Sequence, residues 1–289
     1  MRARMKRRQM YRRVVIVVAV VGILALLIVG FYFAYSAANQ FSPDVGKLVS
    51  SSDISTLQQL SAAPYGPSGS SLLPNVKNYT GTPFTSDGKP LLVYIGADYC
   101  PFCASQRWAM VLALLRFGNF TNLSYMASSP SEGDYVTFSF HGSSYTSKYL
   151  VFQAFEQQDR NNQPLDAVPS NYTGAFSQYG SSYPFMNFGN RYIISGSLIP
   201  PDLLNGKNWS TVMNEIRSGT NLGTDIKESA NVITALICTI TSNQPGSVCN
   251  QSPINGLVIS IDSYVPSAPG MVAPSSSLLA VVPADLRNE

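Results

Sequence analysis

Two of the four cysteines stand three positions apart, as Cys100-Pro101-Phe102-Cys103, and they are the residues best suited to chemistry. A thiol at the N-terminus of a helix loses its proton more readily, because the unpaired N–H groups and the helix dipole favour an anion there. Cys100 would then be the nucleophile: its thiolate attacks a partner disulfide, a mixed disulfide forms, and Cys103 attacks Cys100 to release the product. Run in reverse, the same steps donate a disulfide.

A strand followed at once by a helix is predicted to position this pair. Residues Leu91–Ile95 form a continuous apolar run bounded by turn residues, which is typical of a strand buried on both faces. From Pro101 to Phe117, apolar residues recur at the spacing of one buried helical stripe, and Gly118-Asn119 ends the pattern. Pro101 suits the first helical position, because its missing N–H would have no partner there.

Further elements are predicted on both sides of this unit. Three short segments have strand-like composition, and two more flank Gly189-Asn190, a two-residue hairpin signal. Apolar spacing predicts two later helices, one short helix within a Ser-, Pro- and Gly-rich spacer, and one strand near the C-terminus. The predicted strands are 123–127, 136–140, 149–155, 185–188, 191–194 and 257–261, and the helices are 54–60, 209–217 and 226–241.

The order of strand, C-x-x-C and helix, with a later Pro before a β-hairpin and a final helix, resembles the thioredoxin superfamily. More specifically, roughly residues 50–255 are similar to an archaeal family of membrane-anchored thioredoxin-like proteins of unknown function. The resemblance implies an α/β fold of the thioredoxin type, with a central mixed sheet flanked by helices. It is carried by the blocks GKPLLVYIGADYCPFCASQRWAMVLALLRFGNF, FHGSSYTSKYLVF, YPFMNFGNRYIISG and ICTITSNQPGSVC.

The resemblance also implies a substrate site. In that superfamily a cis-proline before the hairpin faces the cysteines and helps to bind the substrate backbone, and Pro184 holds the matching position. Tyr99, Pro101 and Phe102 are expected to contact substrate beside it. The chain departs from ordinary thioredoxin in three ways: Pro-Phe replaces Gly-Pro between the cysteines, Tyr99 replaces Trp before them, and extra segments lie between the helix and Pro184. The resemblance therefore leaves the substrate and the direction of exchange open.

Cys238 and Cys249 form the second pair. Cys238 lies near the end of an apolar helix and Cys249 in the Pro/Gly turn beyond it, so we interpret them as a structural disulfide. An electron relay to Cys100 and Cys103 is the alternative. A zinc site needs four ligands, and the second pair does not form another C-x-x-C knuckle, so we expect no metal and no cofactor.

Charge and hydropathy predict a membrane anchor at the N-terminus. Seven of the 19 Lys and Arg residues fall in the first thirteen positions, whereas the remainder of the chain has 12 against 16 acidic residues. The 25 uncharged residues from Val14 to Ala38 exceed the roughly 20 that cross a bilayer as a helix. The positive-inside bias places the N-terminus in the cytoplasm and everything after residue 38 outside. A cleaved signal peptide is the alternative, although its apolar region would span only roughly 7–15 residues.

This topology limits the partners. A nucleic-acid binder would spread Lys and Arg over a folded face, so we exclude nucleic acid. Outside the membrane disulfides persist, which favours a redox or structural role for the cysteines. Six Asn-x-Ser/Thr sequons follow the predicted span and are candidate glycosylation acceptors. Their asparagines are Asn78, Asn119, Asn122, Asn171, Asn208 and Asn250.

Four other residues receive a simpler interpretation. His141, the only histidine, is expected at a strand end or on the surface. Asp98 could exchange protons with the cysteine pair, although a solvated loop carboxylate is the simpler interpretation. Arg107, one turn after Cys103, could favour a thiolate and could equally lie on a solvated helix face. Trp108 is expected in the core.

The predicted organisation is a basic cytoplasmic tail (1–13), a transmembrane helix (14–38), a spacer (39–88), a thioredoxin-like domain (89–249) and a Pro/Ser-rich tail (250–289). We predict an extracytoplasmic thiol–disulfide oxidoreductase anchored in the cell membrane by a single span. It would act on thiols or disulfides of secreted or surface proteins and exchange electrons with a redox partner that the sequence does not identify. A non-catalytic surface binding module, in which C-x-x-C is an inert staple, is the alternative.

Overall fold

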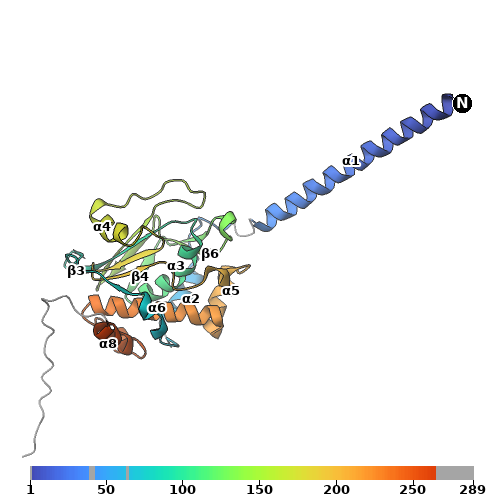
Figure 1. Ribbon diagram of the computed structural model, residues 1–289. Coiled ribbons are helices and arrows are strands. Elements are labelled where there is room, and N and C mark those ends of the chain that lie inside the picture. Colours follow the sequence, from blue (N-terminus) through green and yellow to red (C-terminus); the bar gives the residue numbers. More distant parts are fainter. Residues whose placement is uncertain (1, 39–42, 63–64, 265–289) are drawn as a thin grey trace, which may run out of the picture.

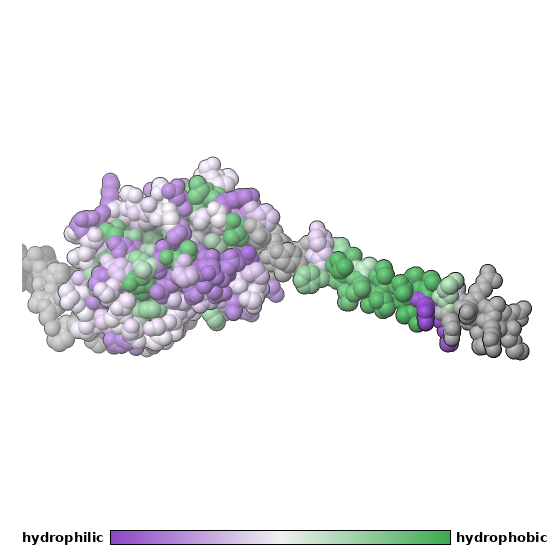
Figure 2. Space-filling model, turned by 90° about the horizontal axis from the view of Figure 1, so that it is seen from above, coloured by the Kyte–Doolittle hydropathy of each residue, from purple (hydrophilic) through white to green (hydrophobic). Residues whose placement is uncertain are grey.

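The computed structural model describes residues 2–38, 43–62 and 65–264 (Figure 1). The first of these ranges is the helix α1, Arg2–Ala38. Within it, Met10–Ala34 is long and apolar enough to cross a membrane, and the rest of the protein buries none of its surface. Figure 2 shows this stretch as a continuous hydrophobic rod with hydrophilic residues near its N-terminal end. The helix is consistent with a single-pass anchor.

A mixed sheet forms the centre of the remaining chain. Its strand β3, Lys89–Gly96, pairs in parallel with β8, Val151–Glu156, and antiparallel with β9, Phe185–Phe188. Beyond β9 follow β10, Tyr192–Ser195, and the short edge strand β1, Lys77–Asn78, while β2, Thr85–Ser86, pairs with the start of β3. The predicted mixed α/β architecture is confirmed.

Both faces of β3 are buried, as its apolar run predicts. Leu92 and Tyr94 join the larger hydrophobic cluster, whereas Leu91, Val93 and Ile95 join a second cluster on the opposite face. This division follows from the pleat, because successive side chains of a strand point to opposite faces of the sheet. The sheet therefore needs helices on both sides.

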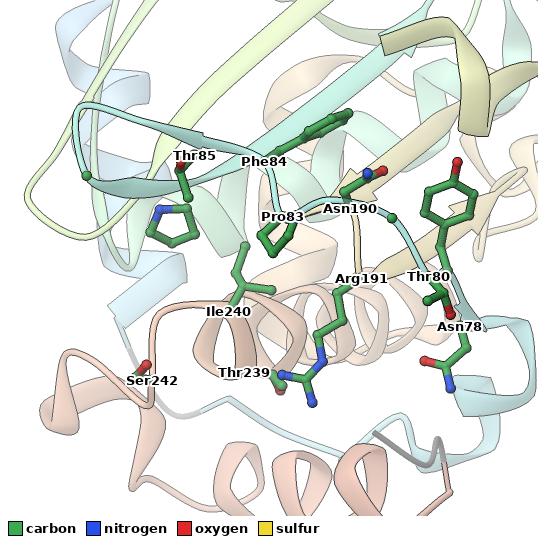
Figure 3. Close-up of a pocket in the computed structure, with 15 residues that line it drawn as sticks. Asn78, Thr80, Pro83, Phe84, Thr85, Asn190, Arg191, Thr239, Ile240 and Ser242 are labelled. Atoms are coloured by element: carbon green, nitrogen blue, oxygen red, sulfur yellow. The ribbon is translucent and has the colours of Figure 1, made fainter. Parts of the chain in front are cut away.

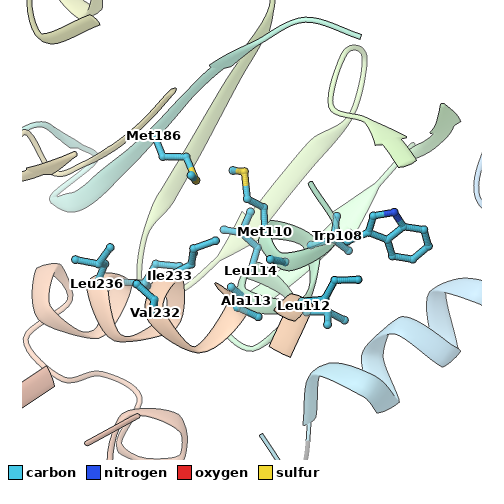
Figure 4. Close-up of a cluster of buried hydrophobic side chains, with 14 of the residues drawn as sticks. Trp108, Met110, Leu112, Ala113, Leu114, Met186, Val232, Ile233 and Leu236 are labelled. Atoms are coloured by element: carbon cyan, nitrogen blue, oxygen red, sulfur yellow. The ribbon is translucent and has the colours of Figure 1, made fainter. Parts of the chain in front are cut away.

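Helices supply this cover unequally. On one face α3, Pro101–Leu115, packs against α6, Asn221–Ile240, and Figure 4 shows their side chains meeting Met186 of the sheet. The other face is covered by α4, Ser170–Gln178, through Ala175 and Phe176. Figure 1 shows α4 on one side of the sheet and α6 with α8 on the other. Further helices around the α3–α6 layer are α2 (Ser51–Ala62), α5 (Trp209–Ser218), α7 (Gly246–Cys249) and α8 (Ile254–Tyr264).

Two small antiparallel pairs lie outside the central sheet. They are β4, Gly118–Thr121, with β7, Ser144–Ser147, and β5, Ser124–Ala127, with β6, Val136–Ser139. Sequence patterning predicted β5 and β6 but missed β4 and β7, because their Ser, Thr, Asn and Gly residues resemble turns. The 3₁₀ turns η1 (Ser70–Asn75), η2 (Pro130–Glu132) and η3 (Pro201–Leu204) complete the elements.

The β9–β10 hairpin is confirmed, and its turn has the predicted chemistry. Gly189 and Asn190 both adopt positive φ, 62° and 59°, as a two-residue hairpin turn requires. The helix α3 differs from its prediction in one respect. Every residue from Cys103 to Leu114 is buried, so the helix lies inside the protein rather than presenting one apolar stripe.

The strand predicted at 257–261 is wrong, because this segment belongs to the helix α8. Its buried residues Ile254, Leu257, Val258 and Ile261 follow the i, i+3, i+4, i+7 pattern of one helical face. They pack with α6 in the main core. A run of apolar residues too short to separate period two from period 3.6 misled the prediction.

The folded unit includes residues on both sides of the predicted 89–249 domain. Within the predicted spacer, 39–88, Leu57 of α2 and Leu73 of η1 are buried in the main cluster, and β1 joins the sheet. Within the predicted tail, 250–289, α8 is part of the same cluster. Residues 265–289 lie outside the described part of the chain.

Cys238 and Cys249 are joined by a disulfide, with their Cα atoms 5.6 Å apart. Cys238 lies two residues before the end of α6, beside Ile240, whose side chain approaches Gly189 in the hairpin turn. That turn lies at the start of β3, since Phe188 pairs with Leu92. Cys100 follows the other end of this eight-residue strand, so the two cysteine pairs lie at opposite ends of the sheet. This placement favours the structural disulfide over the electron relay.

Replacing both residues of this bridge, Cys238→Ala with Cys249→Ala, should lower the free energy of unfolding by about 2–3 kcal/mol, because it reopens a short covalent loop in the unfolded chain. Urea unfolding measures the change. Reduction of the wild type should reproduce the loss, whereas the double variant should not respond to reductant. A change below about 0.5 kcal/mol, the usual range of a neutral surface substitution, would contradict a stabilising bridge.

Candidate functional site

The cysteine pair lies where β3 passes into α3. After β3 ends at Gly96, a turn closed by the bond from the Cys100 amide to the Ala97 carbonyl (3.2 Å) leads into the helix. Cys100 is the N-cap of α3, and its sulfur accepts a hydrogen bond from the Cys103 amide at 3.2 Å. Pro101 occupies the first helical position. The predicted geometry of the two cysteines at a helix start is confirmed.

Both cysteines are free thiols with little contact with solvent. Cys100 retains 5% exposure and Cys103 none. They form a small cluster with Ala97, against which Tyr99 and Tyr183 pack. In this arrangement Cys100 is nearly closed to solvent and Cys103 is fully closed.

The electrostatics separate the two thiols. The pKa of Cys100 is lowered, chiefly by the hydrogen bond from the Cys103 thiol and further by the Cys103 and Phe102 amides and by Arg107, against the opposing effect of burial. The pKa of Cys103 is raised well above its ordinary value, because burial and the neighbouring Cys100 disfavour a second anion. The thiolate form is thus favoured at Cys100, the residue that the sequence predicts as nucleophile.

Arg107 lies fully buried one helical turn beyond Cys103. Its guanidinium holds both carboxylate oxygens of Glu156, at 2.9 and 2.6 Å, and donates to the Ala97 carbonyl at 2.8 Å. Of the two alternatives for Arg107, the solvated helix face is therefore wrong. Sequence reasoning also missed Glu156. The strand predicted at 149–155 ends just before this residue, and parallel strands present their carboxyl ends at the same edge of a sheet.

Asp98 is buried beside this ion pair, so the solvated carboxylate expected there is also wrong. One of its oxygens accepts a hydrogen bond from the Ser139 hydroxyl at 3.0 Å, and the other lies 3.4 Å from Nη2 of Arg107. Burial, followed by the negative charge of Glu156, raises the pKa of Asp98 to about 7, while Arg107 opposes this shift. Two carboxyl groups thus share one guanidinium in a dry region behind the cysteines.

Aromatic side chains form the rim around Cys100. Tyr99 and Tyr183 contact the cysteine cluster, and Phe102 projects from the first turn of α3 with half of its surface exposed. Tyr183 donates to the Gln157 side chain at 2.5 Å and stacks on Phe176 at 5.9 Å between ring centroids. These contacts hold the segment before β9 beside the cysteines.

Pro184 is buried at this position, and the Tyr183–Pro184 peptide bond is cis. Its carbonyl accepts from the Gly196 amide at 2.8 Å. Among the predicted substrate-contacting residues, Tyr99 lies against the pair, Pro101 and Phe102 separate its two members, and Pro184 adjoins Tyr183. The structure therefore brings the segment of Pro184 to the cysteine pair through Tyr183.

His141 and Trp108 lie where the sequence places them. His141 is exposed just beyond β6, with its Nδ1 2.9 Å from Oδ1 of Asp166. Trp108 is fully buried, and its indole N–H donates to the Val136 carbonyl at 2.9 Å. Neither residue belongs to the cysteine site.

A hollow of about 440 Å³ lies at the opposite end of the sheet (Figure 3). Residues of the β9–β10 turn, the start of β3 and the end of α6 line it, among them Asn190, Arg191 and Ile240. Because Cys100 follows the far end of β3, this hollow is separate from the cysteine site.

Comparison with known proteins identifies one family. Residues 75–239 match the model of a family described as "Domain of unknown function (DUF929)". The matched range includes both members of the C-x-x-C pair, Glu156 and Pro184, and excludes Cys249. No curated protein and no solved structure matches the chain.

The thiol–thiol hydrogen bond makes a prediction about the pKa of Cys100. Cys103→Ala should raise this pKa relative to the wild type, because the largest stabilising contact of the thiolate is lost. Cys103→Ser should raise it less, since its hydroxyl can still donate. The pH dependence of Cys100 alkylation by iodoacetamide measures each pKa, and equal values in the two variants would contradict this role of Cys103.

Asp98 makes a prediction about stability. Because its pKa is about 7 in the folded protein and 3.8 ordinarily, the folded state binds this proton more tightly than the unfolded chain. The contribution of this bound proton to the free energy of unfolding is complete below pH 3.8 and is lost as the pH rises to about 7. Urea unfolding between these limits should show the wild type losing stability relative to Asp98→Asn. Asp87→Asn, at an exposed carboxyl group, is the control and should follow the wild type; parallel curves for the wild type and Asp98→Asn would refute the assignment.

Proposed function

Since this chain belongs to the DUF929 family, which is described only as a domain of unknown function, we propose its function from the site itself: a membrane-anchored thiol–disulfide oxidoreductase. The observation that carries the proposal is the Cys100 sulfur at the N-cap of α3, bonded by the Cys103 amide and adjoining a second, buried thiol. A low-pKa sulfur next to a protected one is what ordered disulfide exchange requires.

The reaction proceeds in two exchanges. The Cys100 thiolate attacks one sulfur of a substrate disulfide, whose S–S bond breaks as the Cys100–substrate bond forms, and the other substrate sulfur leaves and takes up a proton. Cys103 then loses its proton and attacks the Cys100 sulfur. The second substrate sulfur leaves as a thiol, and the pair keeps the disulfide. The substrate gains two electrons and two protons, and the reverse sequence oxidises a dithiol.

The arrangement of elements supports a thioredoxin-like fold for this site. The strand that precedes the cysteines lies between a parallel strand, β8, and an antiparallel strand, β9, and a hairpin and the helix α6 follow. The proline before the hairpin has a cis bond, as the resemblance implies. These features are those of a central mixed sheet that presents a C-x-x-C pair at one end.

Substrate contact is proposed for Tyr99, Pro101, Phe102 and Pro184. Phe102 offers an exposed apolar ring beside a nearly closed sulfur, and Tyr183 holds Pro184 on the other side. A protein chain with an apolar residue near its disulfide would cover this rim and exclude water while exchange occurs.

The anchor supports an extracytoplasmic position for this chemistry. With the basic residues of α1 in the cytoplasm, the folded unit lies outside the cell membrane, where disulfides persist. The proposed substrates are secreted or surface proteins, and a separate redox partner restores the pair. The Cys238–Cys249 bridge is consistent with an oxidising compartment.

A Cys103→Ser variant of the full-length protein should accumulate mixed disulfides through Cys100, because the second exchange is blocked. Membranes from cells that express this variant are alkylated. Their proteins are then separated on a non-reducing gel and compared with reduced samples. Cys100→Ser is the matched control and should form at least tenfold fewer adducts. Equal, background levels in both variants would favour the inert staple of a binding module and refute the enzyme.

A further inference from the structure

The sequon asparagines all lie on the surface of this fold, as do several asparagines outside sequons, for example Asn161 and Asn205. Every sequon asparagine is exposed: Asn78, Asn119, Asn122, Asn171, Asn208 and Asn250. The asparagines that are buried among the described residues, Asn187, Asn190 and Asn231, all fall outside sequons. A glycan is bulky and hydrophilic, so only an exposed asparagine is compatible with carrying one in the folded protein.

The buried asparagines use their side-chain amides within the fold. Each buried asparagine donates through Nδ2, for example Asn190 to the Thr82 carbonyl at 2.8 Å and Asn231 to the Pro67 carbonyl at 2.7 Å. In contrast, no hydrogen bond found within the described chain uses Nδ2 of five sequon asparagines. These five are Asn119, Asn122, Asn171, Asn208 and Asn250. The Nδ2 atoms of these five side chains therefore make no hydrogen bond that stabilises the described fold.

At two sites the fold also orients the amide. The oxygen of Asn119 accepts from the Gln58 amide at 3.1 Å, and the oxygen of Asn208 accepts from the Thr211 backbone at 2.8 Å as the cap of α5. With Oδ1 bound to the protein, Nδ2 is the free end of each side chain. Buried middle residues, Phe120 and Trp209, fix the backbone of these same sequons in the core.

We infer from these observations that the five asparagines are N-glycosylation sites of the folded outer domain. The donor is a lipid-linked oligosaccharide phosphate, used by a membrane oligosaccharyltransferase. The Nδ2–C1 bond to the sugar forms while the sugar C1–O bond to phosphate breaks, the lipid phosphate leaves, and one amide proton passes to a base of the transferase. No oxidation occurs. The inference rests on the extracytoplasmic placement in the proposed function.

The positions of these sites suit the proposed redox chemistry. None lies in 97–103, 128–135, 156–169 or 181–184, the segments that surround Cys100 and its buried charges. The segments that carry Tyr99, Phe102 and Tyr183 therefore contain none of the five sites. Glycans at the five sites would also supply hydrophilic surface to a chain with only 12% charged residues, about half of the roughly 25% that is typical.

The full chain is translated with translocation-competent microsomes, and protease protection and gel mobility are read on the same samples. We expect a protected domain with one mobility step per occupied site, compared with a variant that has all six sequon asparagines changed to Gln. Replacing the Ser or Thr of a sequon by Ala keeps its asparagine and should remove one mobility step. The five single variants are Thr121→Ala, Ser124→Ala, Thr173→Ala, Ser210→Ala and Ser252→Ala. Asn161→Gln and Asn205→Gln, exposed and outside sequons, should remove none.

Mass spectrometry of the protein from its native membranes then tests each site, because amidase release of a glycan converts asparagine to aspartate. Glycan on the five asparagines supports the inference, and an asparagine without glycan contradicts it for that site. If the domain is protected from protease but none of the five asparagines carries a glycan, the inference is overturned, while the proposed topology and exchange chemistry stay intact. A protease-accessible domain overturns the topology and the glycosylation together, whereas the mixed-disulfide test judges the redox function separately.

Discussion

The buried ion pair between Arg107 and Glu156 is the contact on which the site depends. A guanidinium taken fully out of water is tolerated only when its charge is paired, and the bidentate carboxylate of Glu156 pairs it through Nε and Nη2. The pair joins the middle of α3 to the end of β8. Removing one partner would leave an unpaired buried charge, at a cost of about 3–5 kcal/mol, so helix and strand are locked in one relative position.

That lock determines how the cysteines are presented. Because α3 is held above the ends of β3 and β8, its first turn faces the loop before β9, and Tyr183 closes against Ala97 and the two thiols. The third charge, Asp98, makes the arrangement respond to protonation, since it competes with Glu156 for one guanidinium. Arg107 also acts on the cysteine pair, because its positive charge is one of the influences that lower the pKa of Cys100.

The opposite end of the sheet has a different character. There the Cys238–Cys249 bridge closes the end of α6, the hairpin turn packs against Ile240, and α8 adds apolar side chains to the core. A covalent bridge joins the segments at this end, whereas the cysteine site relies on charge pairing and hydrogen bonds. The two ends of one sheet thus separate a permanent disulfide from the thiols proposed to exchange.

The sequence alone determined the features that depend on local order. The apolar run of 14–38, the strand of 91–95, the helix start at Pro101 and the Gly189-Asn190 turn each follow from neighbouring residues, and the helix start is enough to place Cys100 at an N-cap. Only the tertiary structure decided that Asp98 and Arg107 are buried, that Glu156 pairs with Arg107, and that 257–261 is helical. These outcomes depend on what packs against each segment. Arg107, for example, is buried because it pairs with Glu156, which lies 49 residues away along the chain. Propensity and period describe a segment, but burial belongs to the assembled sheet and helices.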